Sequence, residues 1–257
     1  MEWGWRITPG ELRSWIVEDT PDVLAVNKPP HVLSHPSKHG PWSSLIGACR
    51  ELLGLARLHM PSRLDRETSG IIVFAKNRQT AARLQRAAAA RRVEKTYLAV
   101  LTGELPAPRT VAQPIGRDDG AAFRARRRVR EDGEAAETEF VPLAWGGGYT
   151  LARVRPRTGR RHQIRVHASW MGHAVAGDKL YGPDPDLMLE FLAHGFSGRL
   201  EKLLPLGRQA LHAASIVFQT KLGREEYRAP LAPDLAAFCY GKMKLDRLPE
   251  GAPVPLP

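Results

Sequence analysis

The chain has 257 residues, 43% hydrophobic and 25% charged, an ordinary globular composition with enough material for one large core or two modest ones. Lysine and arginine total 38 against 27 acidic residues, which gives a formal net charge of +11. That excess favours a protein that meets a polyanion such as nucleic acid, and the alternative is a charge that serves solubility alone. Cys49 and Cys239 are too few for a disulfide framework and are expected to be buried thiols. Neither a membrane-spanning run nor a secretory signal is found, so a cytoplasmic protein is expected.

The first half of the chain predicts two strands and two helices. A buried strand begins at residue 23 and ends at the paired prolines 29–30. Residues 43–54 predict a short helix, with serine at its start and glycine past its end. The apolar run 70–76 predicts a strand, and residues 77–92 predict a helix with Asn77 as its N-cap.

The second half is predicted to hold mostly strands, at residues 95–101, 137–145, 149–156, 209–220 and 225–230, with one helix at 158–172. Strands outnumber helices and do not alternate with them, which indicates an α+β domain with a large mixed, mostly antiparallel sheet flanked by helices. The least regular part, Leu105 to Ala136, carries a basic string at residues 124–132. This string is expected to form either an RNA-facing loop or hairpin, or a solvated charged turn.

One carboxylate lies between two arginines where the chain enters the predicted strand 70–76. Asp65 follows Arg63 and Leu64 and precedes Arg66, in a loop of the kind that commonly carries catalytic groups. The four residues alone are weak evidence, because most exposed arginine–acid pairs are merely solvated. Arg66 is expected to be such a solvated charge.

A second cluster of positive charge occupies residues 155–167, where five arginines accompany two histidines and a glutamine. If the residues after Gly159 are helical, Arg161 and Arg165 share one face and the helix start offers a phosphate site. A solvated basic helix is the alternative, and the threonine, glycine and glutamine within the cluster favour a shaped site.

Three histidines recur every four residues, at His31, His35 and His39. On a helix this spacing would suggest metal ligands, but Pro30 and Pro36 interrupt any helix there, so no metal site is expected. The chain also lacks a Walker-type phosphate loop, a dinucleotide-binding glycine motif and a hydrolase nucleophile elbow. No cofactor is therefore expected.

Six segments, taken in chain order from Val26 to Phe218, resemble the RluA family of RNA pseudouridine synthases. They read "VNKPPHVLSHP", "RLDRETSGIIVFAKN", "KTYLAVLTG", "RTGRRHQIRVH", "AGDKLYG" and "QALHAASIVF". The resemblance covers nearly the whole of a catalytic domain expected at residues 21–240, between an N-terminal extension at 1–20 and a C-terminal tail at 241–257. It implies a pseudouridine-synthase-like fold with a central RNA-binding cleft.

The resemblance also implies roles for single residues. Asp65 is expected to be the catalytic carboxylate, Tyr97 to pack against the target uracil, and Arg165 to pair with Asp65. Spacing alone left Tyr97 as an ordinary core tyrosine of a strand. Arg63 is expected to help displace or replace the flipped nucleotide. Further substrate contacts are expected from Arg160, His162 and Gln163.

The implied reaction is isomerisation of uridine in ribosomal or transfer RNA, which needs neither a metal nor a redox cofactor. Burial would raise the pKa of the catalytic carboxylate, and a guanidinium partner offsets this effect. Two features depart from many relatives: Ser62 stands where they have histidine, and too few residues precede the first strand for an S4-type RNA-binding domain. A monomer is the expected oligomeric state. Two alternatives remain at this point, a catalytically inactive RNA-binding or RNA-folding factor and a hydrolase of the glycosidic bond.

Overall fold

Residues 5–36, 38–184 and 186–249 are described by the computed structural model, and they form two units. The N-terminal unit contains residues 5–95 and 212–232, and the C-terminal unit contains residues 96–211 and 233–249. Residues 250–257 of the expected C-terminal tail lie outside the described residues.

The N-terminal unit is built on strands that pair antiparallel with one exception. The strands are β1 (Ile16–Asp19), β2 (Val23–Lys28), β3 (Ser69–Ala75), β10 (Leu211–Thr220) and β11 (Gly223–Arg228). Strand β3 pairs antiparallel with β2 and parallel with β10, and all seven of its residues are buried. A strand buried on both faces explains why its sequence is a continuous apolar run without alternation.

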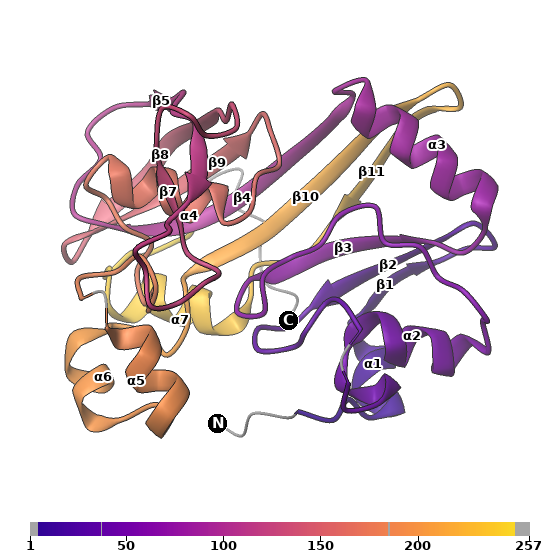
Figure 1. Ribbon diagram of the computed structural model, residues 1–257, viewed down its shortest axis with the longest axis horizontal. Helices are drawn as coiled ribbons and strands as arrows, with labels where there is room; N and C mark the ends of the chain where they lie inside the picture. Colours follow the sequence, from indigo (N-terminus) through magenta and orange to yellow (C-terminus); the bar gives the residue numbers. More distant parts are fainter. Residues whose placement is uncertain (1–4, 37, 185, 250–257) are drawn as a thin grey trace. The chain divides into compact units, whose positions relative to one another are not determined.

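The α-helices of this unit begin at side-chain caps, and a short 3-10 turn begins without one. They are α1 (Pro9–Trp15), the 3-10 turn η1 (Pro41–Ser43), α2 (Leu45–Leu53) and α3 (Arg78–Ala89). Ser44 caps α2, Gly54 ends it in the left-handed conformation, and Asn77 caps α3, as predicted. Helix α3 lies alongside the hairpin of β10 and β11 (Figure 1). Helix α1 was not predicted, although Thr8 and Glu11 form a capping box at its start.

The C-terminal unit has a sheet in the order β4 (Val93–Thr102), β9 (Tyr149–Pro156), β8 (Thr138–Gly146) and β5 (Arg109–Val111), all antiparallel. A glycine turn joins β8 to β9, as predicted, and both Gly147 and Gly148 have positive φ there. The helices are α4 (Gln163–Trp170), α5 (Leu187–His194), α6 (Gly198–Leu203) and α7 (Pro233–Gly241).

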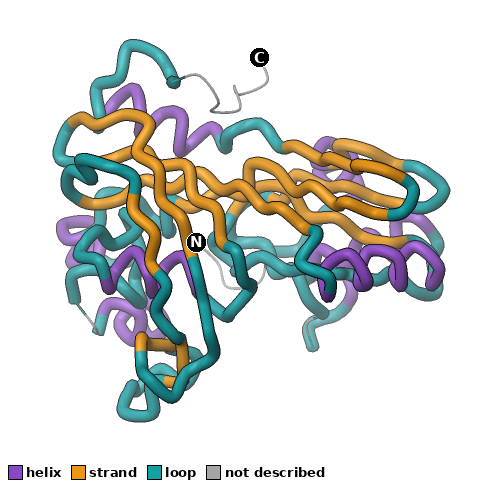
Figure 2. Tube along the Cα trace, turned by 90° about the horizontal axis from the view of Figure 1, so that it is seen from above, coloured by secondary structure: helices purple, strands orange, loops and turns teal. Residues whose placement is uncertain are grey.

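The basic string forms part of a separate two-stranded hairpin, β6 (Ile115–Arg117) with β7 (Arg127–Val129). Figure 2 shows this short pair of strands apart from the longer strands of the same unit. The segment is thus a hairpin, and the choice between an RNA-facing hairpin and a solvated charged turn stays a prediction.

The predicted α+β class with mixed, mostly antiparallel strands is confirmed. Both cysteines are free and buried, as expected, and burial raises the pKa of Cys49 to about 12. Within the described residues no helix is both long and apolar enough to cross a membrane. Helix α4 begins at Gln163, later than the predicted start at residue 158.

Candidate active site

Asp65 lies in the loop that precedes β3, and backbone contacts hold this loop on both sides of it. The hydroxyl of Ser34 donates to the carbonyl oxygen of Leu64 at 2.8 Å. The amide of Thr68 donates to the carbonyl oxygen of Asp65 at 3.1 Å, which closes a tight turn. The half-buried Asp65 therefore sits on a fixed backbone.

A fully buried lysine ties the first family-like segment to the same loop. Lys28 is 0% exposed, and its ammonium donates to the carbonyl oxygens of Pro29, Val32 and Arg66 at 2.9 to 3.0 Å. Arg66 in turn donates from Nε to the carbonyl oxygen of His31 at 3.0 Å. Desolvation lowers the pKa of Arg66. The prediction that Arg66 is merely solvated is therefore wrong, because its guanidinium fastens one loop to the other.

The exit from the Asp65 loop into β3 is held just as closely. Gly70 has a φ of +110°, and a Cβ built on it would lie 2.2 Å from the carbonyl oxygen of Ala213. Ser69 Oγ lies 3.0 Å from Nδ1 of the buried His212. Only glycine permits this approach of β3 to β10, so the loop carrying Asp65 is anchored where the strand begins.

Ser62, the position that departs from many relatives, accepts a hydrogen bond from a lysine. Lys95 Nζ donates to Ser62 Oγ at 2.8 Å. Desolvation lowers the pKa of Lys95. Sequence reasoning identified Ser62 but missed this partner. Arg63, the next residue, is exposed, as a residue that contacts RNA must be.

In the C-terminal unit, Arg165 forms a buried bidentate ion pair with Asp178. Its Nε donates to Oδ2 at 2.6 Å and its Nη2 to Oδ1 at 2.8 Å. Arg165 is 5% exposed and Asp178 is 0% exposed. The backbone amides of Leu180 and Tyr181 also donate to Asp178 Oδ1, at 2.9 and 3.1 Å.

These contacts keep Asp178 ionised. Burial alone would raise its pKa, but the charge and hydrogen bonds of Arg165 and the two amides outweigh burial and lower the pKa of Asp178. Arg165 also lies over the ring of Tyr181, at 5.0 Å from the ring centroid. The predicted pairing of Arg165 with Asp65 stays a prediction.

Asp178 was not among the predicted site residues. Its segment, "AGDKLYG", contributed to the family resemblance, but no role was assigned to the carboxylate. The only signal in the sequence for a role of Asp178 was the presence of an acidic residue in this family-like segment.

Gln163, the first residue of α4, uses both ends of its amide within the protein. Its Oε1 accepts from Thr158 Oγ1 at 2.7 Å and from the backbone amide of Arg160 at 2.9 Å. Its Nε2 donates to the carbonyl oxygen of Glu137 and to Thr138 Oγ1. Gln163 is only 4% exposed, so its observed task is to hold the turn before α4. A direct contact of Gln163 with substrate stays a prediction.

The turn before α4 presents two of the other predicted residues. His162 has a φ of +57°, and its Nδ1 lies 2.9 Å from the hydroxyl of Tyr181. Arg160 donates to the carbonyl oxygen of Ala135 at 3.1 Å and keeps a partly exposed guanidinium. Arg161 precedes the helix, so the premise that Arg161 and Arg165 share a helical face is wrong.

A buried histidine on α4 continues the network. His167 Nε2 lies 2.9 Å from the carbonyl oxygen of Gln113, which can only accept, so Nε2 carries the proton. Nδ1 then accepts from Thr138 Oγ1, also at 2.9 Å. Desolvation outweighs the bond to Gln113 and lowers the pKa of His167. His167 is a structural residue that sequence reasoning did not separate from the rest of the cluster.

Tyr97 lies in β4, opposite Val154 of β9, and is 8% exposed. The neighbouring residues on the strand, Leu98 to Leu101, are buried as well. Burial does not separate a core tyrosine from one that packs on a base, so the role of Tyr97 stays a prediction. Among the described residues no group of three or more histidines, cysteines or acids is arranged to hold a metal ion.

The chain thus combines an α+β fold, a carboxylate on a firmly held loop and a buried Arg165–Asp178 ion pair with sequence segments that resemble RNA pseudouridine synthases. The RNA pseudouridylate synthase family model matches residues 22–170, more than half of the chain. The chain belongs to this family.

Comparison with curated proteins supports the assignment. The chain is 36% identical over 217 residues to an uncharacterised RNA pseudouridine synthase of Chloroflexus aurantiacus, with 81% of this chain and 63% of that protein covered. The chain thus spans less than two thirds of the length of that relative. It is 34% identical to the RNA pseudouridine synthase YjbO of Bacillus subtilis, with 88% and 76% covered. It is 33% identical to the ribosomal large subunit pseudouridine synthase D of Vibrio vulnificus, with 86% and 68% covered.

Two solved human structures have the same fold. The RNA pseudouridylate synthase domain containing 1 protein is 29% identical, with a TM-score of 0.69 and with 91% of this chain and 89% of that chain covered. The domain containing 4 protein has a TM-score of 0.72 at 22% identity, with 94% and 97% covered, and shows the fold alone. The predicted family, fold and enzyme class are confirmed.

Proposed function

We propose that this chain isomerises specific uridines of structured ribosomal or transfer RNA to pseudouridine, with Asp65 as the catalytic carboxylate. Tyr97 packs on the uracil, and Arg165 pairs with Asp65. The observation that carries the proposal is the double anchoring of the Asp65 loop, through the carbonyls of Leu64 and Arg66. Catalysis requires a reacting group held within a fraction of an ångström, which such a loop provides.

The chemistry asks for an ionised carboxylate beside the sugar. The C1′–N1 bond breaks, the uracil rotates, and a C1′–C5 bond forms, so that C5 loses a proton and N1 gains one. Asp65 attacks C1′ or C6 as a nucleophile, or removes a sugar proton, and each route begins from the charged form. Arg165 suits the task of keeping that form charged, because it is a buried guanidinium that a bidentate contact with Asp178 holds in a fixed orientation.

Substrate contacts are assigned to the exposed arginine beside the catalytic loop and to the turn before α4. Arg63 is proposed to help displace the flipped nucleotide or to replace it in the base stack. Arg160 and His162 are proposed to bind the RNA, while Gln163 contributes by fixing the backbone amide of Arg160. The base must leave its stack to reach the pocket, and cations that hold the phosphates offset that cost.

The β6–β7 hairpin is a further proposed RNA contact. Arg124 and Arg128 are exposed there, and within the described residues neither has a carboxylate within 4 Å. Arg130 is different, because it forms ion pairs with Asp119 and Asp132 of the same hairpin segment. Unpaired guanidinium groups beside internally paired ones are the arrangement expected of a surface that binds phosphates.

The remaining proposals concern the setting of the enzyme. Ribosomal RNA is favoured because the Vibrio vulnificus relative is named a ribosomal large subunit pseudouridine synthase. We propose a monomer of the cytoplasm, with its catalytic domain at residues 21–240, an extension at 1–20 and a tail at 241–257. An inactive RNA-binding or RNA-folding factor on the same fold is the alternative.

Replacement of Asp65 tests the proposal. RNA labelled with tritium at uridine C5 releases the label only when the C1′–C5 bond forms. The substitution D65N should lower this release by on the order of 10³-fold or more while leaving RNA affinity within about twofold. Release by D65N within about tenfold of the wild-type rate would show that Asp65 is not the catalytic carboxylate. Absence of release by the wild-type protein on total unmodified RNA would favour the inactive factor.

A further inference from the structure

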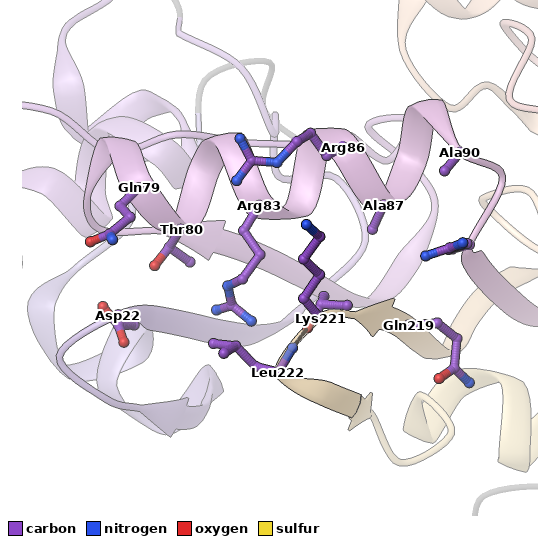
Figure 3. Close-up of a pocket in the computed structure, with 12 residues that line it drawn as sticks. Asp22, Gln79, Thr80, Arg83, Arg86, Ala87, Ala90, Gln219, Lys221 and Leu222 are labelled. Carbon is purple, nitrogen blue, oxygen red and sulfur yellow. Dashed lines mark hydrogen bonds between the residues drawn. The ribbon is translucent and has the colours of Figure 1, made fainter.

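A cavity of about 540 Å³ lies between helix α3 and the turn that joins β10 to β11, within the N-terminal unit (Figure 3). Its volume falls in the range of small-molecule and nucleotide sites. No residue predicted or proposed above for the active site lines it. The lining residues are Asp22, Gln79, Thr80, Arg83, Arg86, Ala87, Ala90, Arg92, Gln219, Thr220, Lys221 and Leu222.

Positive charge dominates this lining, with four cationic side chains and one carboxylate. Arg83 is neutralised by an ion pair with Glu225. The other three cations, Arg86, Arg92 and Lys221, are exposed, and within the described residues none has a carboxylate within 4 Å. The cavity therefore keeps an excess of positive charge that the protein does not balance.

The single carboxylate does not offset this excess. Asp22 lies at the far end of α3, where its Oδ1 accepts from Asn77 Nδ2 at 2.7 Å. Its charge is thus engaged with the cap of the helix. In Figure 3, Arg83 reaches from α3 toward the hairpin and Lys221 reaches from the hairpin toward α3.

The walls of the cavity are held by regular structure. The backbone amide of Gln219 donates to the carbonyl oxygen of Arg92 at 2.9 Å, which joins the segment after α3 to strand β10. Thr220 faces Gly223 at the end of the hairpin, and Thr220 Oγ1 donates to Glu225 at 3.0 Å. The three cations thus come from three separate segments and project from supports that do not need to fold on binding.

The dipole of α3 explains only one of these cations. Arg86 lies in the last turn of the helix, where positive charge is favourable. Arg92 lies beyond the helix, and Lys221 lies on a hairpin far along the chain. All three cations line one cavity, where a bound anion would offset the repulsion among like charges.

We infer that this cavity binds a backbone phosphate of the RNA substrate, at a nucleotide remote from the target uridine. The inference rests on the RNA substrate of the proposed function. Strand β3 separates the Asp65 loop from α3, and its seven residues at about 3.3 Å each span roughly 20 Å. Since a base pair occupies only a few ångströms of helix axis, that distance corresponds to several nucleotides. By this inference the cavity contacts a phosphate several nucleotides away from the target uridine and does not contact the reacting base.

Matched triple variants test the inference. The test protein carries R86Q, R92Q and K221Q. The control carries R13Q, R50Q and R57Q, three exposed arginines of the same unit outside the cavity, so that both lose the same charge. Affinity for an unmodified ribosomal RNA transcript is measured between about 50 and 300 mM potassium chloride.

The test variant should bind on the order of tenfold more weakly, and its log–log salt slope should fall by about two to three relative to wild type. The loss of activity should appear in KM more than in kcat. The control should stay within about twofold of wild type in affinity and KM. Equal affinities and slopes for the two triple variants would mean that the cations serve solubility only, which overturns the inference.

Chemical labelling supplies an independent measurement on the unaltered chain. Amine acetylation is followed by mass spectrometry with no addition, with the transcript, and with inorganic phosphate at millimolar concentration. RNA should protect Lys221 several-fold, while the exposed Lys202 reports general shielding. Protection by inorganic phosphate alone would show a site for a free anion, and equal labelling of Lys221 with and without RNA would refute the inference. Neither result depends on Asp65, since D65N is expected to bind RNA.

Discussion

The buried pair of Arg165 and Asp178 leads to the sharpest prediction. The substitution D178N removes the charge but nearly preserves the volume. The amide oxygen can still accept from the backbone N–H groups of Leu180 and Tyr181. The amide nitrogen, however, then faces a guanidinium that also only donates. Arg165 is left as an uncompensated charge at 5% exposure.

The expected loss of stability in D178N follows from the burial of both partners, since the side chain of Arg165 is 6% exposed and that of Asp178 is 0% exposed. Breaking a buried pair by removing one charge costs about 3–5 kcal/mol of unfolding free energy, because the other charge stays desolvated. At about 2–4 °C per kcal/mol for a unit of this size, D178N should melt about 6–20 °C below wild type. Asp178 has a lowered pKa, so its stabilisation is complete above the unfolded-state value near 3.9 and is lost as pH falls through its folded-state pKa. The difference between the two proteins should therefore be constant at neutral pH and should shrink in acid.

Urea denaturation at several pH values between about 3 and 8 measures this difference. The control is D119N, since Asp119 pairs with Arg130 at the surface and its loss should cost less than about 0.5 kcal/mol. The double variant R165M/D178L replaces the pair by apolar groups and should recover most of the loss without recovering activity. A D178N protein within about 1 kcal/mol of wild type at neutral pH would refute the account of the pair.

Two further predictions concern the packing of β3 and the histidine on α4. The substitution G70A should lower the free energy of unfolding by more than about 3 kcal/mol, or prevent soluble expression. The reason is that a Cβ at residue 70 would lie 2.2 Å from the carbonyl oxygen of Ala213, on a backbone with φ at +110°. The control is G10A in helix α1, whose Cβ would meet nothing within 4 Å, and thermal melting should show it to be neutral or slightly stabilising. His167 has a lowered pKa, so its contribution to stability should be full above the unfolded-state value near 6.5 and should fall as pH drops through its folded-state pKa. H167Q should lack this part of the pH dependence, which lies below about pH 6.5. Identical dependence of the melting temperature on pH in the two proteins would contradict the assignment.

Local signals explain the part of the fold that could be predicted from the sequence. Helix α3 has a capping residue, Asn77, and a run of alanines, so its limits depend on residues near one another in the chain. Strand β3 is an uninterrupted apolar run of strand length. The glycine turn between β8 and β9 is equally local. Helix α1 was not predicted, although its capping box of Thr8 and Glu11 is an equally local signal.

The contacts that shape the candidate site join residues that are not neighbours in the sequence. Lys28 and Arg66 meet 38 residues apart, and Arg165 and Asp178 meet across a turn that no periodicity specifies. A charge pattern gives the number of cations but not which of them find carbonyl or carboxylate partners. For that reason Arg66 was expected to be solvated, although its guanidinium is bound to a backbone carbonyl. Asp65 itself was identified through the family resemblance and not through its spacing.

The ion pair of Arg165 with Asp178 bears on the proposed role of Arg165, which is to keep Asp65 charged. A guanidinium buried against one catalytic acid alone would be neutralised only while that acid is ionised, and the pair would be lost whenever a covalent intermediate removed the charge. Asp178 is held by two backbone amides besides Arg165, so it stays ionised independently of the reaction. Arg165 then remains compensated through every step, and its other donors stay oriented by the bidentate contact. In the proposed pairing of Arg165 with Asp65, the buried Asp178 therefore keeps the arginine compensated while the charge of Asp65 changes during catalysis.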